Sequence, residues 1–201
     1  MTTQKNNKIR TRGFTLVETL VSLSIFASAI VGMIVITSQG INDTNYAKNK
    51  LVAIALSQEG IEIVRNIRDS SLLGDTSGTG QGWDDFLGLI SDCTGGSMCS
   101  IDPLYSDTSG LSITQCGSDS DCVLYRDSQN GPSYFSPDST AGGESSYIRT
   151  IQINEIEDPV SNEITSVEII STVKWTQGSG GQKEVVSKEY LTNWFVNSVT
   201  P

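Results

Sequence analysis

The hydrophobic and polar positions of this 201-residue chain follow two helical patterns in its first third. Residues 14–36 form an apolar run, FTLVETLVSLSIFASAIVGMIVI, in which Glu18 is the one charged residue. From there to about residue 68, apolar side chains recur at spacings of three, four and seven, which predicts one face of a continuing helix. That face comprises Leu51, Ile54, Leu56, Ile61, Val64 and Ile67. No proline interrupts residues 14–68, so we expect one long helix.

The C-terminal third changes to the alternating pattern of strands. Residues 147–156, 167–175 and 185–194 each read as one strand, separated by turn-forming residues at 158–162 and by a hairpin loop at 177–181. Three consecutive strands predict an antiparallel sheet with one face on the long helix, which is an α+β fold. The residues that share one face of the first two strands are Tyr147, Arg149, Ile151, Ile153, Val167, Ile169, Val173 and Trp175.

Between helix and strands lies an acidic middle region, residues 69–146, with twelve acidic residues and one basic residue. Its richness in Gly, Ser, Thr and Asp predicts loops with short strands. We expect Trp83, Phe86 and Leu87 to pack the body against the helix, the alternative being an exposed aromatic binding patch. The predicted organisation is a basic leader at 1–13, a helix at 14–68 and a head at 69–201, divided into 69–146 and the sheet at 147–195.

Composition excludes several functions. The chain has no histidine, which removes Ser-His-Asp and Cys-His catalysis and His-ligated metals. Its net charge of −10 makes it a poor candidate for binding nucleic acid, which needs a concentrated basic surface. The carboxylates are scattered and no nucleophile has a recognisable base, so we expect neither an enzyme nor a cofactor.

The apolar run at 14–36 is long enough to cross a membrane. As a helix it spans roughly 34 Å, against a bilayer core of about 30 Å. The four basic residues before it predict that residues 1–13 stay cytoplasmic and the C-terminus lies outside. A secretory signal, an ordinary anchor and a buried core helix are the alternatives. A secretory signal would have a shorter apolar run followed by a clear small-residue cleavage site. An ordinary anchor does not explain Glu18, because a carboxylate in an apolar span costs about 2.5–3.5 kcal/mol at the bilayer centre.

The string Arg12-Gly13-Phe14-Thr15-Leu16-Val17-Glu18 resembles the processing site of type IV prepilins. The resemblance implies that a dedicated peptidase cuts after Gly13 and then N-methylates Phe14, leaving Glu18 as the fifth residue of the mature chain. It also implies that Glu18 neutralises the new amine of a neighbouring subunit and so fixes axial register. The implied partners are other pilin subunits, the prepilin peptidase and N-methyltransferase, an inner-membrane assembly platform, and the membrane before assembly.

Two further segments are similar to PilV-type minor pilins and pilus modification proteins: LSQEGIEIVRNIRD at 56–69 and VKWTQGSGGQKEVVSKEYLTNW near the C-terminus. Major pilins usually carry a proline in the apolar helix, and this chain has none there. The expected function is therefore a minor pilin of a type IV pilus. The alternatives are a type II secretion pseudopilin and a competence-type subunit at a filament tip. The expected location is the cytoplasmic membrane, then an extracellular pilus or a periplasmic pseudopilus.

The four cysteines and a nearby acidic loop are the remaining candidates. Cys93, Cys99, Cys116 and Cys122 form two C-x5-C pairs, and an exported segment favours disulfides. Of the three pairings we favour Cys93 with Cys99 and Cys116 with Cys122; zinc is the alternative. Asp119, Asp121 and Asp127 offer oxygen ligands for calcium, but the loop lacks the glycine and glutamate of an EF-hand. A solvated acidic loop is therefore the favoured interpretation, and calcium is the alternative.

Overall fold

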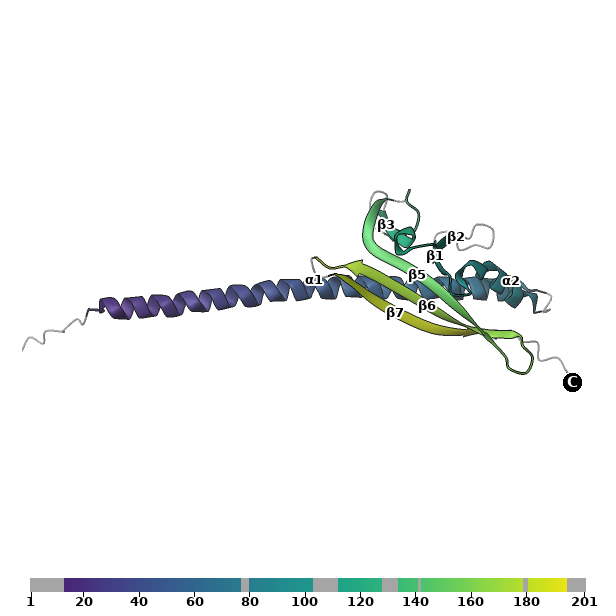
Figure 1. The fold of residues 1–201 in the computed structure, drawn as a ribbon, viewed down its shortest axis with the longest axis horizontal. Coiled ribbons are helices and arrows are strands. Elements are labelled where there is room, and N and C mark those ends of the chain that lie inside the picture. The colour runs from purple at the N-terminus through teal and green to yellow at the C-terminus, as the bar shows by residue number, and fades with distance from the viewer. Residues whose placement is uncertain are drawn as a thin grey trace, which may run out of the picture. The chain divides into compact units, whose positions relative to one another are not determined.

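The computed structural model describes residues 13–76, 80–102, 112–127, 134–140, 142–178 and 181–194. The chain divides into two compact units, residues 1–46 and 47–201. In the first unit the described residues form the beginning of helix α1, Leu16–Gly74, and their side chains are exposed. The second unit holds the rest of α1 and all the other elements (Figure 1).

Helix α1 is longer than the predicted one, which ended near Arg68. Its last turn continues to Gly74 because Leu72, only 1 % exposed, packs into the core of the second unit. The predicted apolar face is mostly right, since Leu56, Ile61, Val64 and Ile67 are buried. Leu51 is 68 % exposed and lies outside that face.

The predicted antiparallel sheet is present, and it is larger than three strands. The long strands are β5, Gly143–Glu157, β6, Ile164–Thr176, and β7, Gln182–Thr192, which pair in that order. Four short strands extend the sheet beyond β5: β1, Met98–Ile101, β2, Ile113–Cys116, β3, Val123–Asp127, and β4, Tyr134–Ser136. On that side β1 and β3 each pair with β5, while β2 pairs with β1 and β4 with β3.

The inward face of the sheet is the one that the alternation indicated. All eight residues that were predicted to share a face are buried, and all of them except Arg149 belong to one of two apolar clusters that also include residues of α1. The β5–β6 register runs without a shift from Tyr147 to Ile156 and changes before Glu157. Within it Ile153 lies opposite Ile169 on β6, and Val173 of β6 lies opposite Val185 on β7. A one-residue slip would turn the whole apolar set toward solvent, so this burial fixes the register.

The prediction of loops and short strands for the acidic middle region is wrong in one respect, because this region also contains a helix. Helix α2, Gln81–Leu89, presents Trp83 and Phe86 on one face, which are 4 % and 0 % exposed in the core beside α1. The predicted packing role of these aromatic residues is confirmed, and an aromatic binding patch is excluded. Short 3-10 turns follow at η1, Ser91–Cys93, and η3, Asp119–Cys122.

Candidate functional site

The candidate cleavage site lies at the start of the described residues, outside any helix. Gly13 and Phe14 precede α1, and Phe14 is 81 % exposed. A Cβ built on Gly13 would meet no atom within 4 Å. Nothing in the described part of the chain therefore requires glycine here, and an external constraint, such as the close approach of a protease to the backbone, is the physical reason that remains. Residues 1–12 of the predicted leader lie outside the described residues.

Glu18 has a local structural role that the sequence analysis missed. The Oγ1 atom of Thr15 accepts a hydrogen bond from the Glu18 N–H at 3.3 Å, and the Thr15 carbonyl accepts one from the Thr19 N–H at 3.2 Å. Thr15 thus caps α1, and Glu18 places an exposed carboxylate in its first turn, where the helix dipole favours negative charge. The Thr-x-x-Glu spacing of residues 15–18 is the sequence pattern from which this cap could have been predicted.

The apolar residues after Glu18 form a surface that no other described residue buries. One described helix, α1, is long and apolar enough to cross a membrane; its most apolar window has a mean hydropathy of 2.4 and none of it is buried. Several hydroxyls in this stretch are satisfied within the helix, as the interior of a bilayer requires. Ser24 and Ser28 donate to the carbonyls three residues earlier, each at 2.8 Å.

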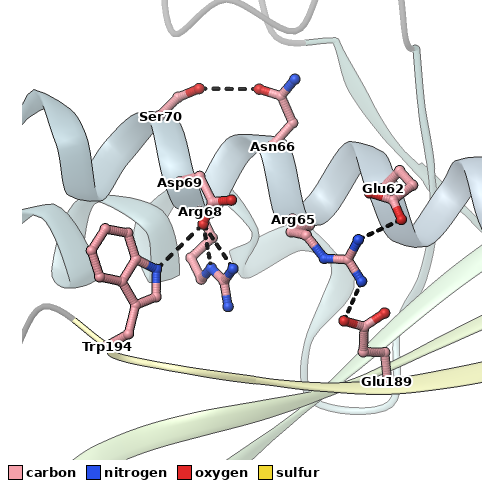
Figure 2. A network of polar contacts seen from close by, with 8 residues as sticks. All are labelled: Glu62, Arg65, Asn66, Arg68, Asp69, Ser70, Glu189 and Trp194. Atoms are coloured by element: carbon pink, nitrogen blue, oxygen red, sulfur yellow. Dashed lines mark hydrogen bonds and ion pairs between the residues drawn. The ribbon is translucent and has the colours of Figure 1, made fainter.

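In the second unit, ion pairs and hydrogen bonds of polar side chains connect α1 to β7 and to the residues just after it (Figure 2). Arg65 bridges Glu62 on its own helix and Glu189 on β7, and these hydrogen bonds, the one to Glu189 foremost, raise the pKa of Arg65. Glu62 and Arg65 lie three residues apart on the helix, a spacing at which opposite charges can pair. Asp69 accepts from Arg68 and from the indole N–H of Trp194, the latter at 3.4 Å. These contacts link α1 to the edge of the sheet.

The cysteines lie in the predicted pairing. Cys93 and Cys99 are joined with a Cα–Cα distance of 5.2 Å, and Cys116 and Cys122 with 5.8 Å. No cysteine is free, so no thiolate remains for zinc. The first disulfide ties η1 to β1 inside the core, and the second closes the loop before β3.

The proposed calcium ligands are occupied by protein groups where they are described. Asp119 accepts from the Lys174 ammonium at 2.8 Å, and Asp121 accepts from the N–H and hydroxyl of Ser118. The side chain of Asp127 lies outside the described part of the structure. Among the described residues, no group of three or more His, Cys, Asp or Glu side chains is placed to hold a metal ion. Calcium at this loop stays an untested prediction.

Comparison with known proteins concerns the N-terminal segment. Residues 8–34 match the model of the prokaryotic N-terminal methylation motif. Over 42 residues the chain is 52 % identical to type II secretion system protein I of Vibrio cholerae serotype O1 (strain ATCC 39315 / El Tor Inaba N16961). This alignment covers 21 % of the chain and 36 % of the relative, so the chain spans about a third of the length of the protein that it matches. No solved structure matches.

The matched residues include the positions that the sequence analysis selected. Gly13, Phe14 and Glu18 all fall within residues 8–34, together with most of the apolar run that follows them. The resemblance to type IV prepilins is thereby confirmed at the level of the motif. The chain carries a prokaryotic N-terminal methylation motif at the start of a long apolar helix.

Proposed function

We propose that this protein is a structural subunit of a pilus-like filament, made as a prepilin and assembled through the apolar part of α1. The observation that carries the proposal is the methylation motif at residues 8–34. Processing after Gly13 would remove the four basic leader residues and leave a new amine on Phe14, beside the capped start of the helix. The fully exposed apolar surface after Glu18 would then pack against neighbouring subunits.

In this proposal Glu18 fixes the axial register between neighbouring subunits of the filament. A carboxylate in an apolar environment needs a positive partner, and the amine of Phe14 on a neighbouring subunit would supply one. A buried pair of this kind contributes more to selecting one register than to stability. Before assembly the chain would sit once across the cytoplasmic membrane, with residues 1–13 inside and the second unit outside.

The filament is either a type IV pilus, with this chain as a minor pilin, or the pseudopilus of a type II secretion system. The similarity of residues 56–69 and of the C-terminal segment to PilV-type proteins supports the first. The second is supported by the relative at 52 % identity, whose name is type II secretion system protein I. Both filaments use the same processing chemistry, so the N-terminus alone favours neither of them.

The decisive measurement is the intact mass of the chain in sheared surface filaments and in the membrane fraction of its native cells. A filament species that begins at Phe14 and carries one extra methyl group is expected for a pilin. A processed species confined to the membrane fraction favours the pseudopilus. A chain that still begins at Met1 in both fractions would refute the proposal and leave an ordinary membrane anchor.

A matched pair of glycine substitutions tests the cleavage site itself. Gly13→Ala and Gly40→Ala add the same methyl group at positions where a Cβ meets nothing within 4 Å. We expect Gly13→Ala to accumulate unprocessed chain, because the obstruction arises only in the protease. Gly40→Ala should be processed like the natural chain. Normal processing of Gly13→Ala would contradict the assigned scissile bond.

A further inference from the structure

The packing of α1 on the sheet is interrupted by a polar layer. On one side of this layer lies the distal cluster, where Ile61, Val64 and Ile67 of α1 pack with α2, η1, β1 and the long strands. On the other side lies the proximal cluster, where Ala53 and Leu56 pack with side chains of β3, β5 and β6. The layer itself consists of Ser57, Gly60, Arg149 and Ser171, of which the three with side chains are fully buried.

Helix and sheet approach each other closely within this layer. A Cβ added to Gly60 would lie 2.6 Å from the Ser171 Oγ atom, so only glycine fits without a shift. Three residues before Gly60, the Ser57 hydroxyl donates to the Ser171 carbonyl at 2.9 Å. Neither apolar cluster includes a residue of this layer, whose largest side chain, Arg149, also donates to the Leu56 carbonyl at 3.5 Å.

Arg149 completes the layer as a buried charge. Its Nη1 atom lies 2.6 Å from the Glu59 carboxylate, and its Nη2 atom donates to the Ile101 carbonyl at 3.1 Å. Its Nε and the Ser171 Oγ have no hydrogen-bond partner among the residues that the structure describes. Burial lowers the pKa of Arg149, although Glu59 acts in the opposite direction. Buried polar atoms without partners weaken the layer relative to the apolar packing on either side.

We propose that the layer divides the docking of α1 into two cooperative units, so that residues 47–56 can leave the sheet while residues 61–72 stay docked. The proximal cluster is the smaller one among the described residues, with six buried members against sixteen. The distal cluster also contains the Cys93–Cys99 disulfide, and Arg149 is held to β1 on that side. Local opening of a small cooperative unit at lower free energy than the whole is general protein behaviour.

The consequence is that the exposed length of α1 can change. Residues 47–56 directly follow the exposed part of α1. Their release would lengthen that exposed part by about ten residues, or roughly 15 Å of helix. This device serves a pilus and a pseudopilus equally, and it does not depend on processing after Gly13.

Thiol labelling of buried positions tests the proposal. All four natural cysteines are in disulfides, so a new cysteine is the only reactive thiol. Ala53→Cys probes the proximal cluster and Val64→Cys the distal one; both parent side chains are 0 % exposed and lie on the same helix. In the detergent-solubilised full chain under native conditions, we expect Ala53→Cys to be labelled at least about tenfold faster than Val64→Cys. Equal rates would overturn the proposal.

A second substitution separates local from global opening. Leu56→Ala, which weakens the proximal cluster, should accelerate labelling at position 53 about tenfold and leave position 64 unchanged. Equal acceleration at both positions would show one cooperative unit and overturn the proposal. If Ala53→Cys does not fold, as judged by circular dichroism, Val52→Cys reports the same cluster, since Val52 packs against it and is partly buried.

Discussion

Substituting Gly60 with alanine tests a close contact between α1 and the sheet. Alanine is favoured over glycine in a helix by about 1 kcal/mol. Against this, the new Cβ would lie 2.6 Å from the Ser171 Oγ, and overpacking of this kind costs about 1–3 kcal/mol. The net expectation for Gly60→Ala is a loss of about 1 kcal/mol, which for a domain of this size lowers Tm by roughly 3 °C.

A double-mutant cycle with Ser171 shows whether that atom is the cause. The Ser171 Oγ is buried without a partner, so Ser171→Ala should cost little or should stabilise. Once it is removed, the nearest atom to a Cβ at position 60 is the Arg149 Cδ at 3.4 Å, an ordinary contact. The double variant should therefore melt at or above the natural protein, with a coupling of about 1–2 kcal/mol.

The assay is thermal unfolding of the detergent-solubilised chain, followed by tryptophan fluorescence. Gly40→Ala is the control, because it makes the same substitution in the same helix with nothing within 4 Å of the new methyl group. It should not lower Tm. The reasoning is refuted if Gly60→Ala melts at or above the natural chain, or if adding Ser171→Ala brings no recovery.

Three more predictions concern side chains of the second unit. Glu59→Gln should cost about 1–3 kcal/mol in urea unfolding, because it leaves the buried Arg149 guanidinium without its carboxylate; an unchanged midpoint would contradict this. Burial raises the pKa of Tyr147, so stability should be complete below pH 10, the unfolded value, and fall as pH rises through the folded one. Tyr147→Phe should reduce that alkaline loss, and equal loss in both chains would count against it. Replacing Cys93 and Cys99 together by alanine should cost about 2 kcal/mol in chemical unfolding, and no loss would mean that the short loop is held by packing alone.

The long elements were predictable because each repeats one simple pattern. In β6 the residues Val167, Ile169, Val173 and Trp175 alternate strictly, and the structure buries every one of them. The apolar start of α1 required only length and composition. Patterns of this kind need no knowledge of the partner surface.

What could not be predicted depends on tertiary contacts. Helix α2 has only nine residues, flanked by glycine-rich sequence, so the spacing of Trp83 and Phe86 was too short a signal to read as a helix. Strand parity placed Arg149 on the inward face, but nothing local indicated that a guanidinium would be buried there. Its partners, Glu59 and the Ile101 carbonyl, lie 90 and 48 residues away in the chain.

Two free energies help to explain why position 18 carries a carboxylate. As a first-turn residue of a capped helix, Glu18 gains about 0.3–1 kcal/mol from the helix dipole. Within an apolar span the same carboxylate costs about 2.5–3.5 kcal/mol when it lies near the bilayer centre. Glu18 lies near the start of the apolar run, so the cost at its position is below this central value. Where that cost still exceeds the gain from the helix dipole, the local role is not the whole reason for this residue. A positive partner removes the deficit, and the amine that processing would create on Phe14 of a neighbouring subunit has the required charge at the same end of the helix. This imbalance supports the proposal that α1 is built to pack beside copies of similar helices.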